Sequence, residues 1–67
     1  MRKVLQYCLE EGIVCELIYQ SDADLFTKRR IKVHEVTDDY VRGYCYLRKA
    51  TRTFKMKNIL SCAPFSS

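Results

Sequence analysis

Residues 40–48 alternate between apolar side chains and aromatic or charged ones, and this pattern constrains the fold more than any other feature of the sequence. The residues that share the apolar side are Val41, Gly43, Cys45 and Leu47. Because side chains on a β-strand point alternately to the two faces of a sheet, this period predicts a strand with one buried face. The chain must therefore supply further strands to pair with it.

Four further segments are rich in β-branched or aromatic residues, and turn-forming residues separate them. Together with the alternating segment, we expect strands at residues 13–20, 27–36, 40–48, 52–57 and 60–63. In the second strand Ile31 and Val33 face inward, and Arg29 falls in phase with them. Glu35 shares that phase. Aspartates favour turns without any catalytic role, and those in the expected turns are Asp22, Asp24, Asp38 and Asp39.

One amphipathic helix is expected before the first strand, at residues 3–11. Gly12 follows it as a residue that accepts the left-handed conformation common at helix ends. A chain of 67 residues holds a single domain, residues 1–67. One helix followed by about five short strands predicts a mainly β fold. In it, a curled antiparallel sheet closes into a small barrel and removes its exposed edges.

Positive charge is concentrated in the second part of the chain. Residues 1–39 contain six basic and eight acidic residues, whereas residues 40–67 contain six basic and no acidic residues. A segment without carboxylates attracts polyanions or acidic partners. The alternative is that a small protein keeps a net charge, here +4, for solubility alone.

The four cysteines are expected to be reduced and buried, because each lies in an apolar or strand-like context and no secretion signal is found. They are too widely spaced for a zinc motif, at Cys8, Cys15, Cys45 and Cys62. No apolar run is long enough to span a membrane. We therefore expect a cytoplasmic protein with no membrane partner, no metal and no cofactor.

Catalysis is not expected from this sequence. The single histidine, His34, lies among basic neighbours on a predicted outer strand face, and no carboxylate close in sequence orients it as a general base. The two glycines, Gly12 and Gly43, are isolated, so the sequence contains no glycine-rich phosphate loop. The expected function is therefore one of binding.

Basic residues and tyrosines interleave on the predicted outer strand faces. They are Lys28, Arg30, Lys32, Tyr40, Arg42, Tyr44, Tyr46, Arg48, Lys55 and Lys57. Arginine and lysine neutralise phosphates and aromatic rings stack on bases, so this combination is typical of surfaces that bind single strands. Tyrosine is also a favoured strand residue, and lysine and arginine protect exposed strands from aggregation. A purely structural interpretation therefore stays open.

Five motifs distributed over the chain carry a resemblance to a known family. They are Leu9-Glu10-Glu11-Gly12, Leu17-Ile18-Tyr19, Arg29-Arg30-Ile31-Lys32-Val33, Gly43-Tyr44-Cys45-Tyr46-Leu47-Arg48 and Arg52-Thr53-Phe54-Lys55-Met56-Lys57-Asn58-Ile59. They resemble motifs of the WYL domain, a small SH3-like or Sm-like barrel found mostly in bacterial transcription regulators.

The chain also departs from the WYL pattern. The signature Trp-Tyr-Leu falls at Asp39-Tyr40-Val41, and Val33 stands where proline is usual. The usual Asp-Arg before the final isoleucine is Lys57-Asn58. The winged-helix DNA-binding domain that often precedes a WYL domain is absent from this sequence. We therefore expect a divergent, stand-alone member.

The resemblance implies a non-catalytic ligand-sensing module that binds nucleic acid or a nucleotide-like anion in transcription regulation. The ligand-facing positions that it implies are Tyr19, Arg29, Tyr40, Tyr44, Arg48, Arg52 and Lys55. Strand phase independently favours four of them, namely Tyr40, Tyr44, Arg48 and Lys55. It places Arg29 and Arg52 in phase with core residues, and a bulge or the rim of a barrel could re-aim these two side chains.

The alternative function is a protein–protein interaction module that docks on a regulator or self-associates. SH3-like barrels offer edge strands for pairing with partner chains, and tyrosine and arginine are common interface anchors. The two functions differ in their response to salt. Binding to phosphates weakens steeply as salt rises, whereas an apolar protein interface persists.

Overall fold

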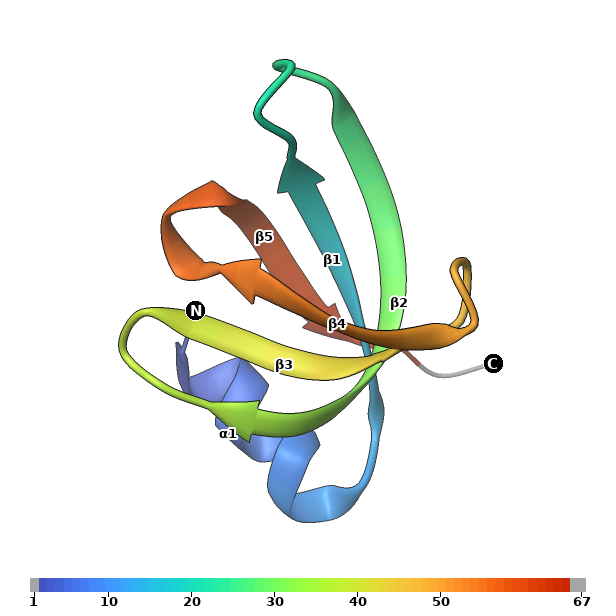
Figure 1. The fold of residues 1–67 in the computed structure, drawn as a ribbon. Helices are drawn as coiled ribbons and strands as arrows, with labels where there is room; N and C mark the ends of the chain where they lie inside the picture. Colours follow the sequence, from blue (N-terminus) through green and yellow to red (C-terminus); the bar gives the residue numbers. More distant parts are fainter. Residues whose placement is uncertain (1, 66–67) are drawn as a thin grey trace.

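One long, bent strand organises the sheet of this protein. The computed structural model describes residues 2–65, which form one α-helix, five β-strands and one 3-10 helix (Figure 1). In chain order these are α1 (Arg2–Glu11), β1 (Val14–Gln20), β2 (Phe26–Val36), β3 (Tyr40–Cys45), β4 (Ala50–Lys55), η1 (Met56–Asn58) and β5 (Ile59–Pro64). Each strand pairs antiparallel with its neighbours. The expected small, mainly β fold with an N-terminal helix is confirmed.

The sheet curls because β2 pairs with β1 along its first part and with β3 along its last part. β2 pairs with β1 through residues 26–32 and with β3 through residues 31–36, and the strand order is β4-β3-β2-β1-β5. Figure 1 shows β2 bending between these two hairpins, with α1 below the curled sheet. In the described residues the ladder ends at β4 and β5, which η1 joins. The described strands therefore form one curled sheet, as expected of a small curled sheet or barrel.

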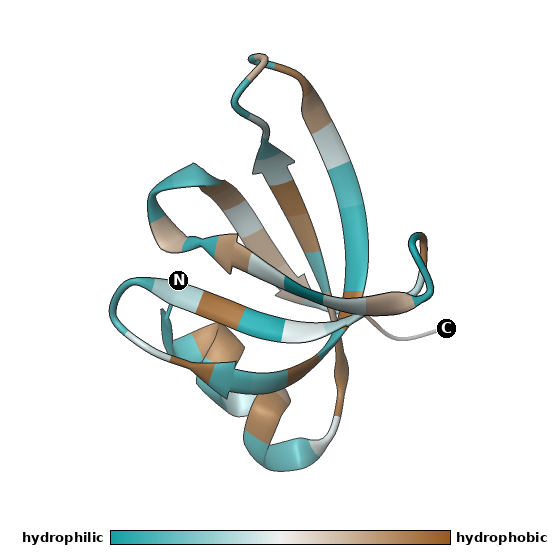
Figure 2. Ribbon diagram, viewed as in Figure 1, coloured by the Kyte–Doolittle hydropathy of each residue, from teal (hydrophilic) through white to brown (hydrophobic). Residues whose placement is uncertain are grey.

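The concave face of the sheet, here called the inner face, holds the core. Its alternating positions meet the helix residues Leu5 and Cys8, and brown and teal segments alternate accordingly along the strands in Figure 2. The buried hydrophobic residues of the strands are Cys15, Leu17, Ile31, Val33, Val41, Cys45, Phe54 and Ile59. As expected, Gly12 ends the helix segment with a φ of 65°, in the left-handed region that glycine accepts.

β3 is shorter than its sequence pattern predicts. It ends at Cys45, and residues 46–49 form a turn in which Lys49 takes a φ of 55°. The backbone N–H of Tyr46 still donates to the carbonyl oxygen of Arg30 at 3.1 Å, after which the chain reverses. Leu47 was expected on the inner face, but it lies in this turn and is 65% exposed. β4 consequently begins at Ala50 rather than at residue 52.

A bulge in β2 changes the expected phase of its last residues. The register between β2 and β3 shifts between Val33 and Glu35, which leaves His34 as the extra residue. Glu35 was predicted to share the inner phase of Val33. It instead pairs with Arg42 on the opposite, outer face, where the two side chains form an ion pair of 3.0 Å. His34 is exposed, as predicted.

Three of the four thiols are buried in the core, and none of the four forms a disulfide. Burial raises the pKa of the Cys15 thiol well above its ordinary value, and the neighbouring Cys8 thiol raises it further. Burial also raises the pKa of Cys62. These thiols remain protonated in the folded protein at pH values where the unfolded chain begins to lose their protons.

Replacing Gly43 should destabilise the fold. A Cβ at this position would lie 2.4 Å from the carbonyl oxygen of Lys32, which is fixed backbone. We expect Gly43→Ala to lower the free energy of unfolding by about 1–3 kcal/mol in urea titrations. Gly12→Asn is the control, because no atom lies within 4 Å of its Cβ position and asparagine tolerates positive φ. Equal losses in the two variants would contradict the close approach of β2 and β3.

Stability should fall as the pH rises above the ordinary thiol pKa of 9.0. Above that pH the unfolded chain releases the Cys15 proton and the folded protein keeps it, so deprotonation favours unfolding. We expect Cys15→Val to flatten the decline in unfolding free energy measured between about pH 8 and 10 under reducing conditions. A variant whose decline runs parallel to that of the wild type would show that Cys15 does not cause it.

Candidate ligand-binding site

The seven predicted ligand-facing residues do not share one surface. Directly paired residues of an antiparallel ladder project from the same face, so the register assigns each position. Arg52 pairs with the inner Gly43, and Arg29 pairs with the inner Leu17. The inner-face residues are Tyr19, Arg29 and Arg52, whereas Tyr40, Tyr44 and Lys55 project from the outer face. Arg48 lies in the β3–β4 turn.

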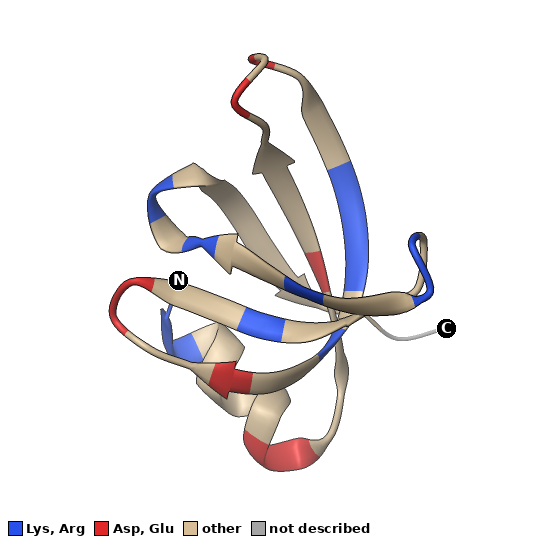
Figure 3. Cartoon of the chain, viewed as in Figure 1, with Lys and Arg blue, Asp and Glu red and all other residues tan. Residues whose placement is uncertain are grey.

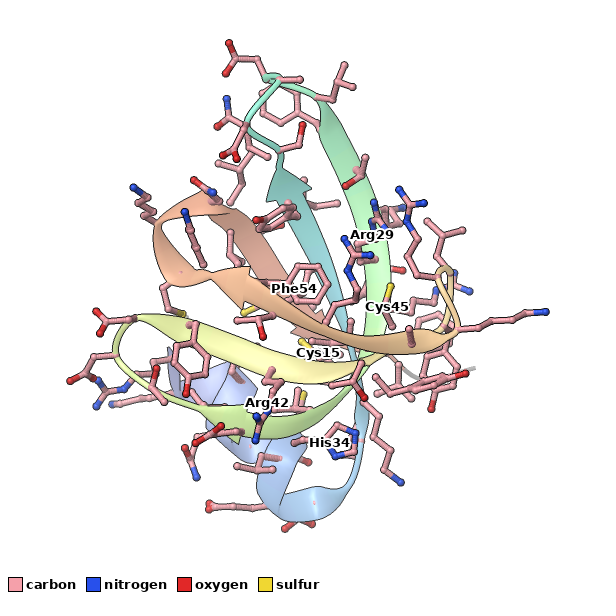
Figure 4. All side chains as sticks on the ribbon, in the orientation of Figure 1. Cys15, Arg29, His34, Arg42, Cys45 and Phe54 are labelled. Atoms are coloured by element: carbon pink, nitrogen blue, oxygen red, sulfur yellow. The ribbon has the colours of Figure 1, made fainter. Side chains whose placement is uncertain are left out.

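We call the inner-face residues Arg29, Arg52, Tyr19 and Thr27 the inner arginine site. Hydrogen bonds join Arg29, Thr27 and Tyr19, whereas Arg52 is exposed and shares only the face with them. Arg29 is half-buried because β3 ends at Cys45, opposite Ile31, so Arg29 has no β3 neighbour beside it. Its Nε donates to Thr27 Oγ1 at 3.3 Å, and its Nη1 lies 3.9 Å from Cys45 Sγ. Figure 4 shows Arg29 and Cys45 near one another beside β2. No bulge re-aims these arginines to the outer face.

An aromatic pair supports the other side of this site. The rings of Tyr19 and Phe54 meet edge to face with centroids 5.1 Å apart. Phe54 is buried and belongs to the core, whereas Tyr19 is half-buried. The hydroxyl of Thr27 donates to the backbone oxygen of Tyr19 at 3.4 Å, which ties the tyrosine to the arginine network. Tyr19 is therefore held on the inner face by Phe54 and by Thr27, the residue that accepts from Arg29.

The pKa of the Cys45 thiol reflects the hydrogen-bond donors around it. Burial raises the pKa of its thiol, but hydrogen bonds from the backbone N–H of Arg48, from the Arg29 guanidinium and from the backbone N–H of Leu47 outweigh burial. The pKa of Cys45 therefore lies below its ordinary value. Donors that stabilise a thiolate also stabilise other anions, so this end of the inner face favours negative charge.

The two inner arginines lack compensating carboxylates. Among the described residues, no Asp or Glu occupies an inner-face strand position, and neither Arg29 nor Arg52 forms an ion pair. Arg30 and Arg42, on the outer face, pair with Glu16 and Glu35. Figure 3 shows that most acidic residues lie in loops and at the end of α1. Unpaired cations on a largely apolar face raise the affinity of that face for an anion.

The outer-face residues have different surroundings. Tyr40 and Lys55 face each other across β3 and β4 and line a hollow of about 500 Å³. Asp38 and Asp39 line the same hollow, and the Tyr40 hydroxyl donates to Glu35 Oε1 at 3.4 Å. These carboxylates oppose an anionic ligand. The size of the hollow therefore counts for less here than the charge of the inner arginine site.

Sequence reasoning missed the residues that hold the site together. Thr27 and Cys45 accept hydrogen bonds from Arg29, and Phe54 supports Tyr19. The sequence did contain one sign of such a site, an arginine in phase with the apolar residues of a strand.

Within residues 2–65, no group of three or more His, Cys, Asp or Glu side chains is arranged to hold a metal ion. The helix of the described chain is neither long nor apolar enough to cross a membrane.

Comparison with known proteins identifies the fold class. No protein-family model matches the sequence, and no curated protein matches it. Among solved structures, the chain is similar to proteasome accessory factor B/C (PafBC) of Arthrobacter aurescens, with a TM-score of 0.80 and 21% identity over 97% of this chain. The match covers 11% of the PafBC chain. The protein therefore shares the fold of a small part of that longer protein.

Removing the inner arginines should not harm the fold. Each is a cation without a carboxylate partner, so an apolar side chain of similar length fits the face at least as well. We expect Arg29→Met and Arg52→Met to change the free energy of unfolding by less than about 1 kcal/mol, or to raise it. Phe54→Ala is the comparison and should lower it by about 3–5 kcal/mol. A loss in Arg29→Met as large as in Phe54→Ala would make Arg29 a structural residue.

Proposed function

We propose that residues 1–67 form a single WYL-like domain that acts as a non-catalytic, ligand-binding module in transcription regulation in the cytoplasm. Its ligand is nucleic acid or a nucleotide-like anion, and the inner arginine site makes the main contact. The observation that carries this proposal is the pair Arg29 and Arg52 on a carboxylate-free, otherwise largely apolar face. The motif resemblance and the shared fold with a part of PafBC support it.

The chemistry of the site suits a phosphate next to a planar group. Guanidinium groups present several donors in a fixed plane and bind phosphate oxygens in pairs. Arg29 is already oriented by Thr27 and Cys45, so little side-chain entropy remains to be lost on binding. Tyr19 offers a ring on the same face as the arginines, which a base or sugar of a nucleotide could contact. Hydrogen bonds to a charged partner contribute about 1.5–3 kcal/mol each.

Ligand length decides whether the outer-face residues take part. β4 is an edge strand of the sheet, so the inner and outer faces meet along it. Arg52 lies on its inner face and Lys55 on its outer face. Arg48 lies in the turn that leads into this strand. A mononucleotide would engage the inner arginine site alone. A single strand could pass over the β4 edge and reach Arg48 and Tyr44 as well. Further along it would reach Lys55 and Tyr40, where Asp38 and Asp39 weaken its binding.

Binding to the inner site should depend on its arginines and on salt. We expect Arg29→Gln/Arg52→Gln to weaken binding of a fluorescent single-stranded oligonucleotide by about 10-fold or more at low salt. The logarithmic salt dependence should become less steep, because fewer phosphates are neutralised. Fluorescence anisotropy measures both quantities. Adenosine monophosphate, as a competitor, tests whether a mononucleotide is sufficient.

Arg42→Gln is the matched control, since it removes one cation from the outer face, where Glu35 already pairs with it. The affinity of this variant for the oligonucleotide should change by no more than about twofold, because Glu35 already compensates the charge of Arg42. Equal weakening in the control and in the double variant would show general attraction to a basic protein. An absence of binding by either probe at low salt would remove the proposed function.

A second candidate function, protein docking, is favoured by a separate observation. Among residues 2–65, three large apolar side chains are more than 60% exposed, namely Leu25, Phe26 and Leu47. None of them contributes to the inner arginine site. Exposed apolar side chains of this size commonly mark an interface.

A further inference from the structure

The tip of the β1–β2 hairpin carries an apolar pair flanked by acids. Leu25 is 62% exposed and Phe26 is 63% exposed, and Asp22 and Asp24 lie beside them. We call these four residues the hairpin tip. Figure 1 shows this hairpin projecting beyond the rest of the sheet. A water-exposed leucine and phenylalanine at a projecting turn are unexplained by the packing of a single copy.

The hairpin tip has a defined conformation. The backbone N–H of Ser21 donates to the oxygen of Leu25 at 2.9 Å, and the N–H of Asp24 donates to the oxygen of Ser21 at 3.0 Å. Gln20 Nε2 donates to the Asp24 carboxylate at 3.0 Å. These contacts fix the turn, so its apolar pair is presented with little conformational freedom left to lose on binding.

A complementary surface lies on the outer face farther along β2. Two shallow hollows of about 330 Å³ and 390 Å³ share Arg30 and Tyr46, and together they form what we call the basic trough. The basic trough is lined by Val14, Lys28, Arg30, Tyr46, Leu47 and Phe65. Its walls are therefore mostly apolar or aromatic, and its charged members are cations.

The basic trough is held in a fixed shape. The Arg30 guanidinium lies 4.0 Å from the centroid of the Phe65 ring, and Glu16 accepts from its Nε at 3.2 Å. The Tyr46 ring meets Tyr44 edge to face at 5.2 Å. Glu16 is thus occupied by Arg30, which leaves Lys28 and the neighbouring Lys32 without a described carboxylate partner. The surface suits an acidic segment with apolar side chains.

We propose that a second copy of this chain occupies the basic trough, in a twofold dimer in which each hairpin tip packs into the trough of its partner. Phe26 and Arg30 both project from the outer face of β2 and are four residues apart, roughly 13 Å along the strand. Two such faces related by a twofold axis cover each other reciprocally. Leu25 and Phe26 then meet Tyr46, Leu47 and Phe65, and the aspartates face the lysines.

This inference does not depend on the ligand of the inner arginine site, because it uses the other face of the sheet. Light scattering after size-exclusion chromatography should show a dimer for the wild type. Phe26→Ser should shift the population to monomer with an unchanged circular dichroism spectrum. Tyr7→Ser is the control, since Tyr7 is 51% exposed on α1 and contributes to neither surface, and it should remain dimeric.

Charge reversal tests the pairing itself. Asp22→Lys/Asp24→Asn makes the tip positive, and asparagine tolerates the positive φ of 58° at position 24. Lys28→Glu/Lys32→Glu makes the trough border negative. Each variant alone should be monomeric, and an equimolar mixture should recover the dimer, because both tip–trough contacts again join opposite charges. A wild type that stays monomeric up to about 1 mM, or a mixture that stays monomeric, overturns the proposal.

Discussion

The bend of β2 is the constraint on which the rest of the structure depends. An 11-residue strand that pairs with β1 over one half and β3 over the other must curve, and the bulge at His34 lets its register follow that curve. The curvature creates the inner face that buries the core against α1. It also leaves Arg29 beyond the end of β3, where an arginine can remain half-buried and in contact with solvent.

Much of this architecture follows from the sequence alone, because alternation and turn residues are local signals. The helix, the number of strands and the inner phase of Ile31 and Val41 agree with the pattern. The end of β3 and the face of Glu35 do not, since each depends on a tertiary event. A turn at Lys49 ends one strand, and an unpaired His34 shifts the other. The alternation of apolar and polar residues in a sequence does not show where a bulge inserts an extra residue into a strand.

For the candidate site too, strand phase can be predicted from the sequence, whereas contacts between strands cannot. Phase correctly placed Arg29 and Arg52 among core residues, yet the resemblance grouped them with outer-face tyrosines. Only the register shows that three of the seven positions lie on the inner face and three on the outer face, while Arg48 lies in a turn. The contacts of Arg29 with Thr27 and Cys45 join residues from separate strands, so sequence spacing could not reveal them. The proposed function would account for two cations on a face whose other positions are largely apolar.

The central claim is that the inner face, rather than the tyrosine-bearing outer face, contacts the ligand. The most direct test is an NMR titration of the labelled protein with adenosine monophosphate, followed at the amides and at the arginine side chains. The account predicts shifts at Arg29, Arg52, Thr27 and Cys45, with Tyr44 and Tyr46 unmoved. Shifts confined to Tyr44, Tyr46 and their outer-face neighbours would contradict it.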